Sequence, residues 1–225
     1  MDLLVNNRVI LVVGGTGLVG SAVVEQLRSE GATVIVASRR GSGGITLDAG
    51  DDASVSKAIA HVLQEHGRID GLVVAAAPPA QSLDPARSSE PNQVLSAVDG
   101  KAMAFLRVAS AVIPSMRESG FGRIVVVSGQ NAFITGNITG SVRNAATTII
   151  AKNLADELAG SGVTVNSVSP AVVTVTPSAT VAPGRGGDST PQQIADLVAF
   201  LISPLSGVSG ESIAVGHRML GATLI

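Results

Sequence analysis

Short runs of consecutive apolar residues alternate along this chain with stretches in which apolar residues recur every three or four positions. The first run, residues 9–13, is followed by a glycine-rich turn, and apolar positions from Leu18 to Leu27 then follow a helical period. Gly31 ends that helix, and residues 33–37 form a second apolar run. An unbroken apolar run of this length is typical of a buried parallel strand, so the pattern predicts a strand, a turn, a helix and a second strand.

The same alternation continues along the rest of the chain. Further strands are expected at residues 45–48, 71–75, 122–128, 163–168 and 212–215. Helices are expected to end near residues 66 and 159 and to cover residues 92–119 and 190–202. The helix ending near residue 159 places on its core face Ile149, Ile150, Leu154 and Leu158. Strands alternating with helices, without repeats or a linker, predict an α/β protein: a single Rossmann-fold domain over residues 1–225, with a doubly wound parallel sheet of about seven strands.

The glycine-rich turn after the first strand is the strongest functional signal. Glycines at 14, 17 and 20 lie between a predicted strand and a predicted helix, which is the arrangement that places a dinucleotide pyrophosphate on a helix N-terminus. The alternative is a purely structural turn. If the turn binds a nucleotide, it supplies five cofactor-binding residues: Gly14, Thr16, Gly17, Leu18 and Gly20.

Residues after the second strand bear on which dinucleotide is bound. Units that bind NAD carry an acid at the end of this strand, whereas this chain has Ser38 followed by Arg39 and Arg40. A guanidinium group suits a ribose 2′-phosphate, which favours NADP(H) over NAD(H); the alternative is two solvated loop arginines. Asp48 is placed to accept from an adenine amino group; the alternative, which is compatible with the first, is that it belongs to the N-cap region of the next helix with Asp51, Asp52 and Ser54.

Composition excludes several other classes of function. The chain has 225 residues, 45% hydrophobic and 14% charged, and a net charge of -2, so it lacks the basic surface that binds nucleic acid or an anionic membrane. No apolar run is long enough to span a bilayer, and no signal peptide is recognisable at the N-terminus, so a cytoplasmic protein is expected. The absence of cysteine excludes disulfides and cysteine metal sites, and no metal site is predicted.

The order of these features resembles the short-chain dehydrogenase/reductase family along nearly the whole chain. Five segments carry the resemblance: residues 14–20, 37–39, 47–48, 122–128 and 163–170. The resemblance implies a nicotinamide cofactor and a homodimer or homotetramer formed through two long helices. It also implies cofactor contacts, mostly to backbone, after the fourth and sixth strands, at Ala75, Ala76, Ala77, Pro170, Ala171 and Val173.

The catalytic residues of the family are where the chain departs from the pattern. The family's Tyr-x-x-x-Lys pair falls on Gly140 and Asn144, or on Val142 and Ala146 when counted from the preceding strand, and the chain contains no tyrosine. The family's serine falls on Gly129, with Ser128 one residue earlier.

The family's asparagine, on the helix before, falls on Asp99. The catalytic candidates are therefore Ser128, Asn144 and Asp99, the last as a proton donor if burial raises its pKa. Gln130 and Asn131 are further hydrogen-bonding candidates. Arg143 and Lys152 are bases near the site, but neither is at the position of the family's lysine.

Three functions fit this sequence. The first is an NADP(H)-dependent reductase of a small carbonyl compound that uses a proton donor other than tyrosine. The second is a non-redox enzyme, such as a cyclase, isomerase or dehydratase, on the same scaffold. The third is a catalytically silent NADP-binding sensor or partner protein. In each case residues 174–190, rich in Thr, Ser, Ala, Pro and Gly, are expected to form a mobile loop over the substrate.

Overall fold

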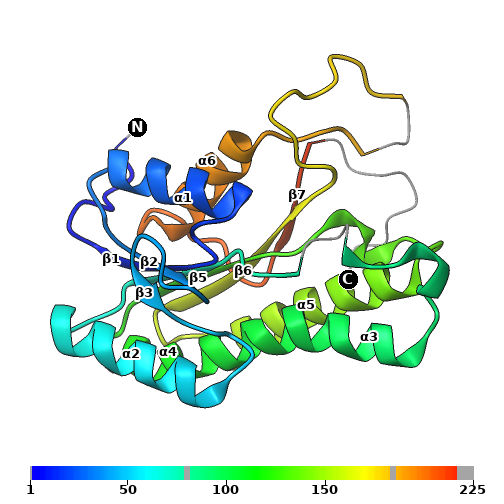
Figure 1. Ribbon diagram of the computed structural model, residues 1–225. Helices are drawn as coiled ribbons and strands as arrows, with labels where there is room; N and C mark the ends of the chain where they lie inside the picture. Colours follow the sequence, from blue (N-terminus) through cyan, green and yellow to red (C-terminus); the bar gives the residue numbers. More distant parts are fainter. Residues whose placement is uncertain (1, 79–81, 183–185, 217–225) are drawn as a thin grey trace.

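The chain folds around one seven-stranded parallel sheet, described here from a computed structural model for residues 2–78, 82–182 and 186–216. The strand order is β3-β2-β1-β4-β5-β6-β7, with a switch point between β1 and β4 (Figure 1). The strands are β1 (Val9–Val13), β2 (Thr33–Ser38), β3 (Ile45–Thr46), β4 (Gly71–Val74), β5 (Gly122–Val127), β6 (Val163–Pro170) and β7 (Ser212–Val215). The predicted single-domain, doubly wound Rossmann fold is therefore confirmed.

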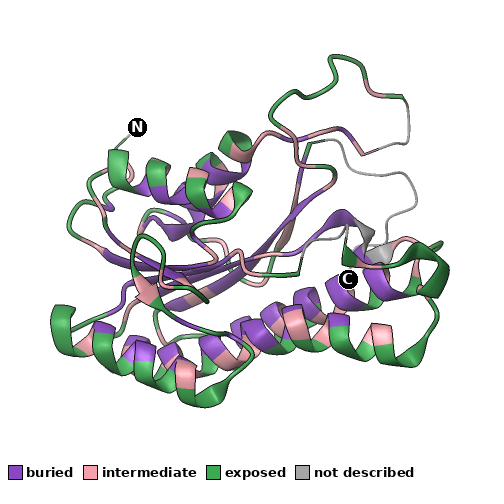
Figure 2. Cartoon of the chain, in the orientation of Figure 1, coloured by how far each residue is buried: buried purple, intermediate pink, exposed green. Residues whose placement is uncertain are grey.

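Helices cover both faces of the sheet and bury its apolar strands (Figures 1 and 2). On one face the core joins the sheet to α1 (Leu18–Ser29) and α6 (Pro191–Ile202). On the other face it joins the sheet to α2 (Asp52–His66), α4 (Ala104–Ser119) and α5 (Ile138–Glu157). Helix α3 (Pro91–Val98) packs against α5. No helix in the described part of the chain is long and apolar enough to cross a membrane.

Two predicted details were wrong. The helix expected over residues 92–119 is interrupted by a π-helical turn at Asp99–Met103, which separates α3 from α4. Ile149 is 36% exposed rather than part of the core, although Leu154 and Leu158 are buried. Helix α5 contacts both the sheet and α3, so its buried positions are largely small or polar residues, and the apolar period does not identify its inner face.

The connection between β2 and β3 is unusually short for parallel strands. Parallel neighbours normally need a crossover of about a dozen residues or more, whereas only residues 39–44 join these two. Gly44 passes so close to β2 that an added Cβ would lie 2.0 Å from the carbonyl oxygen of Val36. Strand β3 has two residues rather than the predicted four. A groove lies beside β3 along α2, and three strands separate β3 from β5.

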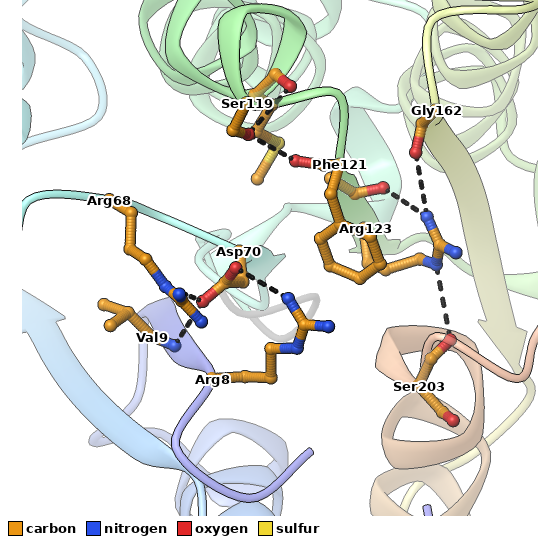
Figure 3. Close-up of polar contacts among 11 residues, drawn as sticks. Arg8, Val9, Arg68, Asp70, Ser119, Phe121, Arg123, Gly162 and Ser203 are labelled. Atoms are coloured by element: carbon orange, nitrogen blue, oxygen red, sulfur yellow. Dashed lines mark hydrogen bonds and ion pairs between the residues drawn. The ribbon is translucent and has the colours of Figure 1, made fainter. Parts of the chain in front are cut away.

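The amino ends of the central strands are held together by a charged network (Figure 3). Asp70 is buried and accepts hydrogen bonds from the backbone N–H of Val9 at 2.8 Å and from the side chains of Arg8 at 3.2 Å and Arg68 at 2.8 Å. The guanidinium groups of Arg8 and Arg123 lie 4.3 and 4.4 Å from the centre of the Phe121 ring. This network stabilises the edge of the sheet opposite to the one where the candidate site lies.

Candidate active site

The glycine turn is shaped by close backbone packing at two of its three glycines. Gly14 has a φ of +82°, and a Cβ added there would lie 2.6 Å from the backbone nitrogen of Ala76. A Cβ added to Gly20 would lie 2.1 Å from the carbonyl oxygen of Gly14. These two positions admit no side chain because the turn, the first helix and the end of β4 are in contact.

Gly17 is different, because its side-chain position is open. A Cβ added to Gly17 would lie 3.4 Å from the nearest atom outside its chain neighbours, and the residue is exposed. Gly17 is the N-cap of α1, and no side chain there hydrogen-bonds to the first turn. A helix N-terminus that is exposed and not capped by a side chain offers backbone N–H groups to an anion. Packing within the protein does not require a glycine at position 17, but the absence of a side chain there lets a ligand approach the backbone closely. Thr16 and Leu18, on either side, are exposed.

The residues expected to contact the adenosine end lie at the carboxyl ends of β2 and β3. Ser38 ends β2, and its hydroxyl oxygen is buried without a hydrogen-bond partner in the described structure. Arg39 and Arg40 follow it and are exposed, and neither forms an ion pair with any described residue. Asp48 is exposed and accepts from the backbone N–H of Gly50 at 2.9 Å. The N-cap of α2 is Asp51, and the backbone N–H of Asp48 donates to the hydroxyl of Ser54 in the first turn of that helix at 2.9 Å, so this segment does form the start of the helix.

The other predicted cofactor contacts follow β4 and β6 at the same edge of the sheet. Ala75 and Ala76 are half-buried next to the glycine turn, and Ala77 is exposed. Pro170 ends β6 and is buried, whereas Ala171 and Val173 after it are half-buried. All predicted contacts therefore lie along the carboxyl edge, where ligands of open α/β sheets bind.

A buried polar cluster lies at this edge, after β5. The hydroxyl of Ser128 donates to the backbone oxygen of Asn144 at 3.1 Å and lies 3.3 Å from the hydroxyl of Thr148. The Nζ of Lys101 donates to the Asn144 Oδ1 at 2.7 Å and to the Ser128 backbone oxygen at 2.9 Å. Lys101, Ser128 and Asn144 are all at most 6% exposed. The structure thus brings two of the predicted catalytic candidates together and places beside them Lys101, which the sequence analysis did not name.

Asp99, the third predicted catalytic residue, does not belong to this cluster. Its side chain is 55% exposed and pairs with Arg107 at 2.7 Å. Lys101, two residues later in the π-helical turn, is the residue of this helix that reaches Ser128 and Asn144. One signal was available: Lys101 lies three positions after Val98 and four before Phe105, and so is a lone cation on the apolar face of the predicted helix.

Burial, together with the smaller effect of the nearby positive charge of Arg143, lowers the pKa of Lys101 from its ordinary value of 10.5 to about 7. Arg143 is itself 5% exposed, and burial lowers the pKa of its guanidinium. Its Nη1 donates to the carbonyl oxygen of Pro78 at 3.2 Å, while its Nε has no partner in the described structure. An amine with a pKa near neutrality exchanges protons readily at physiological pH.

The remaining polar candidates take no part in the cluster. Gln130 is buried and its amide donates to the backbone oxygen of Val215 at 3.1 Å. Lys152 donates to the backbone oxygen of Gly210 at 2.9 Å. The side chain of Asn131 lies outside the described part of the structure. Within the described residues, no group of three or more His, Cys, Asp or Glu side chains is placed to hold a metal ion.

Comparison with known proteins points to one family. Residues 15–217 match the family described as Enoyl-(Acyl carrier protein) reductase. The short-chain reductase protein NovJ of Streptomyces niveus is 31% identical, over 92% of this chain and 92% of its own length. Dehydrogenase/reductase SDR family member 4 of Bos taurus is 29% identical, over 96% of this chain and 88% of its own length. The aldohexose dehydrogenase of Thermoplasma acidophilum superimposes with a TM-score of 0.78 at 25% identity, over 95% of this chain and 93% of that one.

Proposed function

Because the chain belongs to the short-chain dehydrogenase/reductase family, we propose that it is a reductase of small carbonyl compounds that uses NADP(H) and takes its proton from Lys101. The observation that carries the proposal is the buried contact of the Lys101 ammonium with Asn144 and Ser128, at the sheet edge that also holds the glycine turn. An ionisable group buried there is typical of acid–base chemistry.

The residues of the carboxyl edge fit a dinucleotide. Gly17 and the start of α1, which no side chain caps, suit a pyrophosphate. Arg39 is exposed and forms no ion pair with any described residue, so it suits a ribose 2′-phosphate, which supports NADP(H) over NAD(H). When bound, this cofactor supplies a hydride. The reduction of a carbonyl group then requires one proton at the carbonyl oxygen.

Lys101 is the residue best suited to supply that proton. The chain has no tyrosine, and Asp99 is exposed and paired with Arg107. The hydroxyl of Ser128 already donates within the cluster, so we assign Ser128 and Asn144 the role of holding the ammonium group. Two of the three N–H bonds of Lys101 are occupied by these partners, which leaves one for a substrate oxygen.

Two further proposals concern assembly and access to the site. Helix α5 exposes apolar side chains at Ile138, Val142 and Ile149, and the neighbouring segment exposes Leu95 and Met103. These side chains support a homodimer or homotetramer formed through the long helices. Residues 174–190 are the proposed loop over the substrate; its two ends meet where Val173 and Ser189 form an isolated β-bridge, and within the loop the backbone N–H of Ser178 donates to the side chain of Asp188 at 2.9 Å.

Cofactor binding is the first test of this function. NADPH and NADH are titrated into the protein while the nicotinamide fluorescence is followed; the chain has no tryptophan or tyrosine to interfere. We expect micromolar binding of NADPH, weaker binding of NADH, and at least a tenfold loss of NADPH affinity in Arg39→Ala. The matched control is Arg117→Ala, an exposed arginine at the end of α4.

The outcomes separate the alternatives. Failure to bind either cofactor contradicts the reductase and the sensor together. Binding without turnover of any carbonyl compound in a broad panel favours the sensor, and substrate turnover without change in NADPH absorbance favours a non-redox enzyme. A Lys101→Met variant that binds NADPH normally and retains full carbonyl reduction contradicts the role proposed for Lys101.

A further inference from the structure

Two buried cations in the candidate site have no acidic partner among the described residues. Lys101 and Arg143 are 6% and 5% exposed, and the charge of Arg143 lowers the pKa of Lys101, which places them within electrostatic reach of each other. All 17 Asp and Glu residues of the chain lie among the described residues. None of them forms an ion pair with either cation in the described structure.

The two cations lie where the end of β4, the π-helical turn and α5 meet. Arg143, on α5, donates to the carbonyl oxygen of Pro78, just after β4. The same Pro78 packs on Gly100, the neighbour of Lys101, since a Cβ added to Gly100 would lie 2.9 Å from its ring. Lys101 in turn donates a hydrogen bond to the side chain of Asn144, the residue after Arg143. The cationic pocket, defined by Lys101 and Arg143, thus shares Lys101 with the cluster that contains Ser128 and Asn144.

The amine of Lys101 can lose its proton and so avoid the cost of a buried charge, whereas the guanidinium group of Arg143 stays charged. Burial of a charge without a counter-charge is strongly unfavourable, so an unpaired buried arginine requires a compensating group. The Nε of Arg143 has no hydrogen-bond partner in the described structure, and guanidinium N–H groups match the two oxygens of a carboxylate. The compensating group that fits these atoms is an anion from outside the chain.

We propose that the cationic pocket binds the carboxylate group of the substrate, which makes the substrate a small oxo acid. Arg143 holds the carboxylate, and Lys101 is left to face the carbonyl oxygen next to it. The binding of an anion also favours the protonated form of Lys101, so the substrate itself promotes the form of the lysine that donates. This inference rests on the proposed function for the identity of the anion as substrate, but the pocket is testable without turnover.

Calorimetric titration tests the pocket directly. Pyruvate and acetoacetate, their uncharged methyl esters and inorganic phosphate are titrated separately into the protein, with and without saturating NADP⁺. We expect the two carboxylates to bind with and without NADP⁺ and the esters to bind at least tenfold more weakly. Arg143→Gln should weaken carboxylate binding at least tenfold, and the matched control Arg117→Gln, on an exposed arginine, should leave it unchanged.

Three results would overturn the pocket: esters that bind as well as acids, carboxylate binding that survives Arg143→Gln, or an anion that competes with NADP⁺, which would assign the cations to a cofactor phosphate. Carboxylate binding by a protein that binds no NADP⁺ would instead support the pocket and contradict the reductase.

A variant that removes the charge separates this role from a structural one. Arg143→Met keeps an apolar stem but removes the unpaired cation, so the free protein should melt at a higher temperature than the wild type, while the stabilisation by acetoacetate disappears. A lower melting temperature together with retained stabilisation by acetoacetate would show that Arg143 serves the fold and not a ligand.

Discussion

The ammonium nitrogen of Lys101 lies 2.7 Å from the side-chain oxygen of Asn144. The lysine comes from the π-helical turn between α3 and α4, and the asparagine comes from α5. The family resemblance places these two residue types the other way round, with the lysine on the later helix. The same pair of groups therefore meets in this protein from exchanged positions, which brings the ammonium group beside Ser128 from the opposite helix.

Stability should depend on pH through Lys101. Its pKa is about 7 in the folded protein and 10.5 ordinarily, so between these values the unfolded chain holds a proton that the folded protein has released. The destabilisation is complete below about pH 7 and disappears as the pH rises to the ordinary pKa. Relative to Lys101→Met, the wild type should therefore gain about 1.4 kcal/mol of unfolding free energy per pH unit in this window.

Urea unfolding followed by circular dichroism between about pH 7 and about pH 10 measures this difference, because the chain lacks the aromatic fluorophores Trp and Tyr. Lys152→Met provides the control: this lysine lies on α5, and its amine donates to the backbone oxygen of Gly210. A constant difference between wild type and Lys101→Met across the window would contradict the lowered pKa of Lys101.

Asp99 and Asn144 should respond very differently to substitution. Asp99→Asn breaks an exposed ion pair with Arg107 and should change the unfolding free energy by less than about 1 kcal/mol, with no effect on cofactor or carboxylate binding. Asn144→Ala removes an acceptor from a buried ammonium group and should cost about 1.5–3 kcal/mol. Equal effects of the two substitutions in urea unfolding would argue against the cluster.

The glycines of the turn offer a matched pair of substitutions. Gly20→Ala places a methyl group against the carbonyl oxygen of Gly14, so it should destabilise the fold by about 1–3 kcal/mol or more. Gly17→Ala meets no atom closer than 3.4 Å and should leave the melting temperature nearly unchanged, but reduce NADPH affinity at least tenfold because the methyl group lies where the ligand approaches. Unchanged NADPH affinity in Gly17→Ala would mean that the turn serves packing alone.

Substitution of Asp70 should lower the stability of the fold without changing the affinity for NADPH. It is buried between Val9, Arg8 and Arg68 at the amino edge of the sheet, so Asp70→Asn leaves two arginines without their partner and should cost about 2–4 kcal/mol of unfolding free energy. NADPH affinity should stay within twofold of the wild type under conditions where the variant is folded, because the cofactor site lies at the other edge. A selective loss of affinity would show that the two edges are coupled.

The sequence was sufficient for the sheet and for the glycine turn because both depend on local patterns. Unbroken apolar runs identify buried parallel strands, and glycines 14 and 20 stand where backbone segments touch. For Lys101 the sequence offered only its position as a lone cation on the apolar face of the predicted helix, since no local pattern reveals where an α-helix widens into a π-turn. Ile149 was misplaced because α5 is buried against both the sheet and α3, and polar residues such as Thr147 and Thr148 occupy its inner positions.

The π-helical turn at Asp99–Met103 also sets which face of α3 is turned toward α5, relative to the orientation of α4. Each residue of an α-helix advances the chain by about 100°, so if the same residues were wound as a regular α-helix, the segment before the turn would be rotated by roughly that angle relative to α4. Helix α3 would then present a different set of side chains to α5, and the two halves of the long helix would no longer dock on the same neighbour. The one extra residue in the π-helical turn thus lets α4 remain in the core while α3 packs on α5 and Lys101 reaches the candidate site.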